Sequence, residues 1–278
     1  MKIGILEYQD YHQIYVKTLR AILEDYDVTI FNDYKMAQQS TKDLDFLFVN
    51  SIRPLPFDII HWIRFKPKCK AIWTIHNANT ELTYSKILLK RFDAINVFLP
   101  ATKKYIKEKG LYNGTIYTIP FMIHLKKYEN KNDMFVVPGK IEKFRRDYDF
   151  AFNMMKKSDK WCFLGKPIGS YGKEVLQKCK ELNKEGYNIK TFTEYVEEEE
   201  YETILKECKA VVSPLRNPTA GHNRLKKEYY GLTKACGARF EAIKYGKPYI
   251  SSINDYQLDY RDYTLPKMKK QMEEILSH

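Results

Sequence analysis

The 278-residue sequence lacks several patterns that would assign it quickly to a functional class. It has no run of about 18 apolar residues, so no transmembrane helix is predicted. Its start, MKIGILEYQDYH, is typical of a strand followed by polar residues, and a signal peptide is not expected there. P-loop, HExxH, GxSxG and zinc-ligand spacings are absent. Because GxGxxG is also missing after the first strand, the sequence argues against a nicotinamide-dependent enzyme.

Cysteine is scarce and scattered, with five residues and no CxxC pair. An odd, dispersed set predicts reduced thiols and argues against a disulfide framework or a zinc site. We therefore expect a cytoplasmic protein without a bound metal.

Positive charge is abundant but unevenly distributed. The net charge is +12, and residues 51–146 alone carry 19 Lys and Arg against 7 Asp and Glu. A second excess lies in residues 201–250, with 10 basic and 4 acidic residues. Such a basic surface attracts phosphates, anionic lipid headgroups or nucleic acid, although a generally Lys-rich surface chemistry would also raise the total.

Buried strands alternate with helices along the whole chain, which predicts βαβ units and parallel sheets. The pattern is interrupted by the polar stretch HLKKYENKND, residues 124–133, which is the best candidate linker. The sequence thus predicts an α/β protein with a first domain over 1–125 and a second over 133–278, closed by the helix LPKMKKQMEEIL.

Candidate phosphate-binding residues follow two predicted strands of the second half. Gly139 and Lys140 come directly after FVVP, and Arg145 and Arg146 follow shortly afterwards. Glycine permits close backbone approach, and arginine can hold phosphate oxygens through two parallel N–H groups. Gly165 ends the next strand in the same way. A solvated basic loop remains the alternative.

The segment EYYGLTKACGARFEAIKYGKPYISS, residues 228–252, predicts a Gly-rich loop, a short helix with Arg239 and Glu241, and a strand near Pro248. A helix beginning after Gly231 or nearby would offer free N–H groups and a positive dipole end to a phosphate. A carboxylate one turn into that helix can accept hydrogen bonds from two ribose hydroxyls.

In the first half, His76 follows a buried strand directly, where sites form in such sheets; a structural role is the alternative. Asp10 and His12 follow the first strand, where the base of an inverting transferase would lie. Asp10 could equally cap the first helix.

These pieces, in this order, resemble the GT-B glycosyltransferases. The similar segments are TIHN, VFLPATKKYIKEKG, IYTIPF, VVPGKIEKFRRDYDFAF, YETILKECKAVVSPL and residues 228–252. The second half is most similar to the large retaining, nucleotide-sugar-dependent group, the family 4-like enzymes. The piece RFEAIKYGKPYI is also similar to a motif of phage DNA glucosyltransferases.

The resemblance implies two Rossmann-like domains facing each other across a cleft. It implies that Glu241 holds the ribose, that Lys140 with Arg145 or Arg146 holds the diphosphate, and that His76 lies near the transferring sugar. Glu228 resembles the first glutamate of the family's paired motif and would contact the donor sugar. The family's spacing of eight residues before Glu241 instead falls on Thr233.

The implied reaction moves a sugar from a nucleotide diphosphate sugar, such as UDP-glucose, to an acceptor hydroxyl, with retention and without a metal or cofactor. The expected acceptor is a glycan or lipid-linked saccharide, with peripheral contact to an anionic membrane at its inner face. DNA as acceptor, and nucleotide binding without transfer, are the alternatives.

Overall fold

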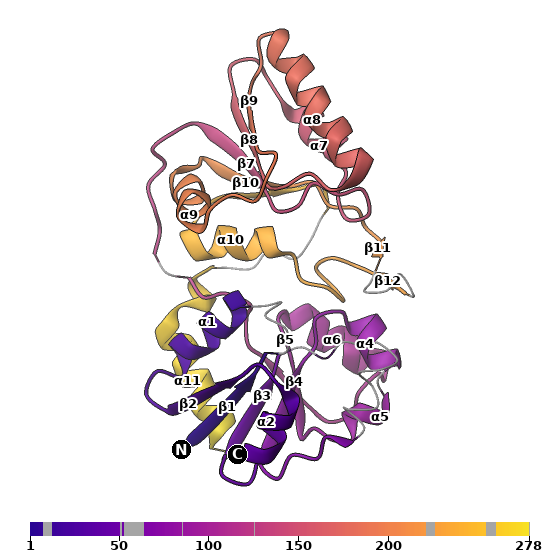
Figure 1. Cartoon of the computed structure of the whole chain (residues 1–278), viewed down its shortest axis with the longest axis vertical. Coiled ribbons are helices and arrows are strands. Elements are labelled where there is room, and N and C mark those ends of the chain that lie inside the picture. Colours follow the sequence, from indigo (N-terminus) through magenta and orange to yellow (C-terminus); the bar gives the residue numbers. More distant parts are fainter. Residues whose placement is uncertain are drawn as a thin grey trace. The chain divides into compact units, whose positions relative to one another are not determined.

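The computed structural model describes residues 1–7, 13–50, 52, 64–84, 86–124, 126–220, 226–253 and 260–277 (Figure 1). The chain forms two compact units. The first contains Met1–Ile123, Gly221–Ala235 and Tyr263–His278, and the second contains His124–Ala220 and Cys236–Asp262. Each unit is therefore assembled from more than one stretch of sequence, and the segment Gly221–Ala235 and the end of the chain both return to the first unit.

The first unit is built on a parallel sheet. In the described residues its strand order is β2-β1-β3-β4-β5-β6. The strands are β1 (Lys2–Leu6), β2 (Asp27–Phe31), β3 (Phe46–Val49), β4 (Lys70–Thr74), β5 (Ala94–Val97) and β6 (Thr115–Thr118). The central strands read as nearly continuous apolar runs, such as FLFV and AINV, because helices cover both faces of a parallel sheet. The order reverses direction between β1 and β3, which makes this position the topological switch point of the unit.

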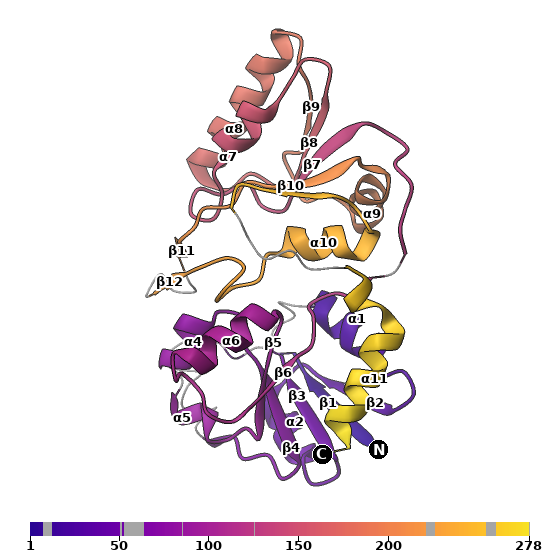
Figure 2. The same ribbon diagram turned by 180° about the vertical axis from the view of Figure 1, so that it is seen from behind.

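Helices pack on both faces of this sheet. They are α1 (Gln13–Ile22), α2 (Tyr34–Ser40), α4 (Ala78–Tyr84), α5 (Lys86–Leu89), α6 (Pro100–Glu108) and α11 (Leu265–Leu276). Helix α2 lies in front of the strands in Figure 1, whereas α11 lies in front of them in Figure 2. Helix α11 is held by the Lys269 ammonium, which contacts Glu24 and Asp25, and by Gln271, whose Nε2 donates to the Thr118 carbonyl at 2.9 Å.

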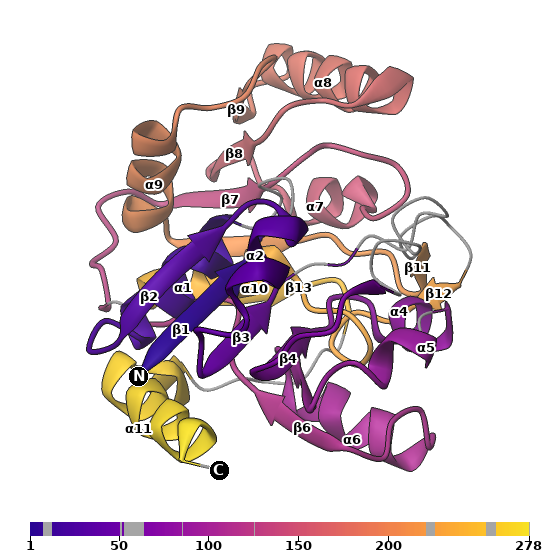
Figure 3. The same cartoon turned by 60° about the horizontal axis from the view of Figure 1, so that its bottom comes forward.

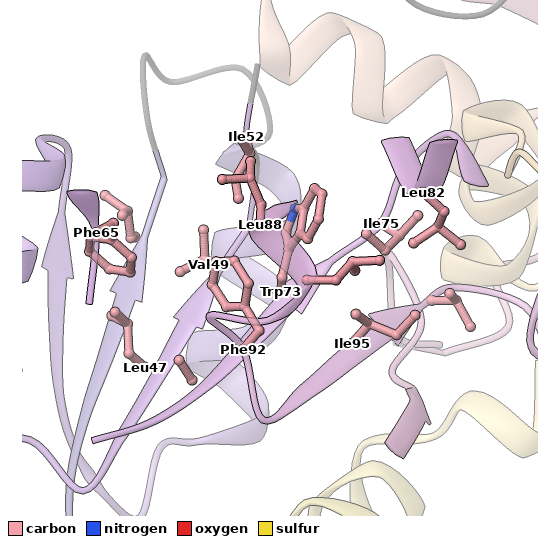
Figure 4. Close-up of a cluster of buried hydrophobic side chains, with 14 of the residues drawn as sticks. Leu47, Val49, Ile52, Phe65, Trp73, Ile75, Leu82, Leu88, Phe92 and Ile95 are labelled. Atoms are coloured by element: carbon pink, nitrogen blue, oxygen red, sulfur yellow. The ribbon is translucent and has the colours of Figure 1, made fainter. Parts of the chain in front are cut away.

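The core on the α2 side is shown in Figure 4. Alternate strand residues point to this face, among them Leu47, Val49 and Trp73, and all three are fully buried. Leu82 of α4 and Leu88 of α5 close the cluster from the helices. Burying a large apolar side chain stabilises the fold by roughly 1.5–3 kcal/mol, so this cluster contributes substantially to the stability of the first unit.

The second unit repeats the architecture around another parallel sheet, with the order β13-β10-β7-β8-β9. Its strands are β7 (Met134–Pro138), β8 (Lys160–Leu164), β9 (Asn188–Thr191), β10 (Ala210–Ser213) and β13 (Tyr249–Ser251), and its helices are α7 (Tyr148–Met154), α8 (Gly169–Lys184), α9 (Glu198–Glu207) and α10 (Gly237–Tyr245). Figure 3 shows α8 beside β9, where Asn183 exchanges two hydrogen bonds with the Ile189 backbone. Here the strand order reverses between β7 and β10.

The predicted linker is tightly held by the second unit. Lys247 is buried and donates to the carbonyls of Tyr128 and Glu129 and to Asn130 Oδ1, at 3.0, 3.2 and 2.9 Å. His124 Nδ1 contacts the Ile243 carbonyl at 2.8 Å. The segment after residue 123 is therefore packed against the end of α10 and is not a freely exposed connection.

Two further expectations concern local structure, and the structure corrects the first of them. Helix α10 begins at Gly237 and not near Gly231, because Thr233 and Lys234 donate their N–H groups to the Tyr229 carbonyl and form a turn there. The strands β11 (Thr219–Ala220) and β12 (Lys227–Glu228) precede this turn in the chain. The segment FDIIHWIRFK, residues 57–66, is also predicted to be helical, but most of it lies outside the described residues. Every helix of the described ranges is too short or too polar to cross a membrane.

Candidate functional site

The carboxyl ends of β7 and β10 meet at the switch point of the second unit, and Arg146 lies across them. Its Nη2 donates to the Pro138 carbonyl at 3.1 Å, and its Nη1 donates to Ser213 Oγ at 3.2 Å. The backbone there is fixed as well, since Arg146 forms a bridge with Leu215. A guanidinium is therefore fixed where ligands bind in sheets of this kind.

Two glycines explain how the ends of β7 and β8 come close together. A Cβ atom on Gly165 would lie 2.1 Å from the Gly139 carbonyl oxygen, which no side chain can tolerate. Gly139 has φ +94° and donates its N–H to the Leu164 carbonyl at 2.9 Å. The structure thus gives both predicted glycines a packing role at the strand ends.

The other predicted cations lie at the surface around Arg146. Lys140 is exposed, and its ammonium lies 6.0 Å from the ring centre of Tyr195, a side chain that is 64% exposed. Arg145 is partly exposed and forms an ion pair with Glu142 at 3.4 Å. Arg216, which the sequence analysis did not single out, donates its Nε to the Arg146 carbonyl at 2.8 Å. This edge of the sheet is consequently rich in positive charge.

The N-terminus of α10 faces the same switch point. Its N-cap, Cys236, makes no side-chain capping hydrogen bond, and Cys236 Sγ lies 3.3 Å from Ser213 Oγ. A Cβ atom on Gly237 would meet no atom within 4 Å, so the space beside the first turn is open. The first N–H groups of a helix, together with its dipole, favour an anion at this position.

Glu241 is the most unusual side chain of the unit. It is only 6% exposed, and no described residue donates a hydrogen bond to its Oε2 atom. Burial raises its pKa from 4.5 to about 7; Lys244 opposes this rise and Glu202 adds to it. An unpartnered buried carboxylate is costly, and such groups are concentrated at functional sites.

One neighbour of Glu241, Tyr201 of α9, is also influenced by Arg146 of the basic edge. Burial and the charge of Glu241 raise the pKa of Tyr201 well above its ordinary value, whereas Arg146 lowers it. Arg239 is also only 6% exposed, and its guanidinium lies 5.6 Å from the ring centre of Tyr249. Arg239 and Glu241 are thus part of the buried body of α10.

In the first unit, the predicted residue His76 belongs to a polar cluster at the switch point between β1 and β3. Its Nε2 lies 2.8 Å from the Asn50 carbonyl and 3.2 Å from Asn50 Oδ1. The Asn50 side-chain amide in turn donates to the Glu7 carboxylate. Glu7 and Asn50 directly follow β1 and β3, so their place after buried strands was the signal that could have identified them.

Glu228 lies in the same unit, fully buried against α4. Its carboxylate accepts the N–H groups of Asn79 at 3.3 Å and Thr80 at 2.8 Å, as well as the Thr80 hydroxyl at 2.7 Å. Thr233, at the alternative position for the motif's first glutamate, accepts a hydrogen bond from the Tyr229 N–H at 2.8 Å. Both side chains therefore make structural contacts within the first unit.

Glu81 of α4 is another buried acid, and the sequence analysis did not identify it. Its two carboxylate oxygens accept the backbone N–H groups of His76 at 3.1 Å and Asn77 at 2.9 Å. Burial raises its pKa to about 7, and Glu228 adds to the rise. The remaining predicted residues, Asp10 and His12, lie outside the described residues.

Comparisons with known proteins address the fold. No protein-family model matches the chain, and no curated protein matches it. Among solved structures, it is similar to AviGT4, a glycosyltransferase involved in avilamycin A biosynthesis, with 12% identity and a TM-score of 0.59 over 98% of this chain and 88% of that chain. It is also similar to sucrose-phosphate synthase from Thermosynechococcus elongatus, with 13% identity and a TM-score of 0.62 over 100% of this chain and 90% of that chain. With its two parallel α/β units, the chain has the GT-B fold, as predicted from its sequence.

Proposed function

We propose that this protein transfers a sugar from a nucleotide diphosphate sugar to an acceptor hydroxyl. Two solved structures that share its fold are a glycosyltransferase and a sucrose-phosphate synthase. The observation that carries the proposal is Glu241, a buried carboxylate with an unpartnered oxygen on the helix that begins at the β7–β10 switch point. Ribose hydroxyls are suitable donors for such an oxygen, since a charged acceptor strengthens the hydrogen bond.

The diphosphate is proposed to lie between Arg146 and the N-terminus of α10. Arg146 already spans the two strand ends, so its guanidinium is oriented before a ligand arrives, and less conformational entropy is lost on binding. Lys140 and Arg145 extend the positive charge outward. Together these groups would neutralise the charge that develops on the leaving diphosphate, so that task does not require a metal.

A retaining reaction is the stereochemical outcome that we propose, with His76 contacting a sugar hydroxyl. We no longer assign Glu228 to the donor sugar. Both of its carboxylate oxygens are occupied by α4, and the side chain has no exposed surface. Its contribution is proposed to be the attachment of the 226–235 segment to the first unit.

The acceptor is proposed to be a saccharide linked to a lipid. Helix α5 exposes Ile87 at 65% between Lys86 and Lys90, a combination suited to an anionic membrane surface. Ile87→Glu should reduce co-sedimentation with phosphatidylglycerol-containing vesicles several-fold, because it replaces inserted apolar surface with a repelled charge. Met36→Glu is the matched control, since Met36 of α2 is 61% exposed in the same unit. Equal binding by both variants would contradict a membrane contact through α5.

A second candidate function is nucleotide binding without transfer. It is favoured by one observation: the two positions available for the first glutamate of the motif, Glu228 and Thr233, are both engaged in structural contacts. Binding of a nucleotide sugar with neither transfer nor hydrolysis would support it.

The test is a thermal-shift screen of the full chain against UDP-, GDP-, ADP- and dTDP-sugars, with and without Mg²⁺. A ligand at about 100 times its Kd stabilises the protein by about 2.7 kcal/mol. A shift with one nucleotide class that is lost in Glu241→Gln but kept in Glu174→Gln would support the donor site, because Glu174 is an exposed residue of α8. No shift with any donor, or a shift that Glu241→Gln leaves intact, would overturn the assignment.

A further inference from the structure

The polar cluster at the switch point of the first unit consists of Glu7, Asn50 and His76, joined by hydrogen bonds. Glu7 and Asn50 have no role in the proposed donor site. Glu7, Asn50 and His76 follow β1, β3 and β4, which are neighbours in the sheet. Glu7 and Asn50 have no exposed surface, whereas His76 is partly exposed. The imidazole is therefore the member of the cluster that a ligand can reach, and the other two lie beneath it.

The hydrogen bonds determine which ring nitrogen of His76 carries the proton. The Asn50 carbonyl, 2.8 Å from Nε2, can only accept, so Nε2 must donate. The Asn50 side chain is consistent with this: its amide nitrogen donates to the Glu7 carboxylate, which leaves Oδ1 directed at Nε2 at 3.2 Å. A neutral His76 thus carries its proton on Nε2 and its lone pair on Nδ1.

The ring orientation is fixed from further sides. Phe98, directly after β5, packs edge-on against the imidazole with centroids 5.0 Å apart. Glu81 accepts the His76 backbone N–H, which holds the main chain at the end of β4. Glu7 thus supports His76 through Asn50, and Glu81 supports it through the backbone.

The geometry points to Glu7 and Asn50 as positioning residues that set the Nε2–H tautomer of His76, because the Asn50 carbonyl can only accept from Nε2 and Glu7 holds the Asn50 side chain. Glu7 also stabilises the imidazolium form through Asn50, because a nearby carboxylate favours the charged ring. That His76 acts on a sugar of the transfer reaction rests on the function proposed above; the tautomer and the effect of Glu7 do not.

The first measurement is the tautomer itself, in the full chain labelled with nitrogen-15 at histidine. His76→Gln identifies the signals, and long-range proton–nitrogen NMR correlations show which nitrogen is protonated in the neutral ring. A protonated Nε2 and an unprotonated Nδ1 support the proposal. A proton on Nδ1 overturns it, and this result needs no variant of the cluster.

The second measurement is the titration of the His76 ring in Glu7→Gln. The glutamine keeps the shape and an acceptor for Asn50 but removes the charge, so the imidazole midpoint should fall by about one pH unit. Glu108→Gln is the control: it removes a charge from an exposed residue of α6 in the same unit and should leave the midpoint unchanged. Glu81 is present in all three proteins, so its own titration cancels from the comparison. Equal midpoints in Glu7→Gln and the wild type overturn the role of Glu7.

Activity separates this inference from the proposed function. If the protein transfers sugar, Glu7→Gln should lower kcat at least about tenfold with a nearly unchanged KM for the donor, because it acts through His76 and not on the nucleotide. If the protein transfers sugar but the NMR measurements contradict the expected tautomer and midpoint, the positioning roles are refuted and the proposed function stands. If the NMR results are as expected but the protein transfers sugar from no donor, the positioning roles stand and the proposed function is refuted.

Discussion

Replacing Glu241 by glutamine should make the protein more stable at high pH and worse at binding nucleotides. Burial raises the pKa of this carboxyl from 4.5 to about 7. The folded protein therefore binds a proton more tightly than the unfolded chain, so stability falls as pH rises from about 4.5 through about 7. The direction is opposite to that of an ordinary ion-paired carboxylate, whose pKa is lowered in the folded state.

The size of the effect follows from the shift. At 1.36 kcal/mol per pKa unit, a shift of about 2.5 units means that Glu241 lowers the unfolding free energy by about 3.3 kcal/mol at pH 8 and by about 0.8 kcal/mol at pH 5, relative to a group with the same pKa in both states. Glutamine removes this dependence and adds only a pH-independent cost for its own buried amide. The unfolding free energy of Glu241→Gln relative to the wild type should thus increase by about 2.5 kcal/mol between pH 5 and pH 8.

Urea unfolding at the two pH values measures this difference, with Glu174→Gln as the control that should show none. Binding of the nucleotide sugar selected by the thermal-shift screen, measured by calorimetry, should be weaker by about 10- to 100-fold in Glu241→Gln, since a hydrogen bond to a charged group contributes about 1.5–3 kcal/mol. Wild-type binding should also tighten from pH 6 to pH 8, because ribose hydroxyls stabilise the ionised carboxylate. A pH-independent stability difference would refute the burial argument, and undiminished binding would refute the ribose role.

Three further substitutions test other parts of the second unit. Arg146→Ala should weaken nucleoside diphosphates at least about tenfold while leaving nucleosides nearly unaffected; equal weakening of both in calorimetry would contradict the diphosphate role. Gly165→Ala should destabilise the protein by about 3 kcal/mol or prevent folding, because its Cβ would lie 2.1 Å from the Gly139 carbonyl oxygen; an unchanged urea midpoint would contradict the close approach. Lys247→Met should cost about 3 kcal/mol in the same assay by leaving its three acceptors unpaired, whereas exposed Lys173→Met should cost nearly nothing.

The local structure of the second unit followed closely from the sequence. Apolar runs such as FVVP and AVVS predict buried strands wherever helices cover both faces of a sheet, and the observed β7 and β10 lie at these runs. The placement of Glu241 on a short helix after a Gly-rich loop also needs only local information. The start of that helix was misjudged by six residues, because the hydrogen bonds that close the turn at Tyr229 cannot be inferred from the residue types alone.

Which cation reaches both strand ends could not be predicted from the sequence. Lys140, Arg145 and Arg146 are all basic residues of one loop, yet it is Arg146 that donates hydrogen bonds at the ends of both β7 and β10. That selection depends on β10 lying beside β7, a pairing between residues more than 70 positions apart. The same holds for Glu228, whose burial against α4 joins segments separated by 148 positions.

The sequence by itself determined the alternation of strands and helices and the positions of glycine at strand ends, because hydrophobic periodicity and backbone sterics act over a few residues. The GT-B fold class was implied by the resemblance of several segments to that group of enzymes. Only the tertiary structure decided that the 221–235 segment and α11 belong to the first unit, that Glu241 is buried without a partner for Oε2, and that Glu7 and Asn50 support His76. These features depend on strand order and on desolvation, and both arise from contacts between residues far apart in the chain.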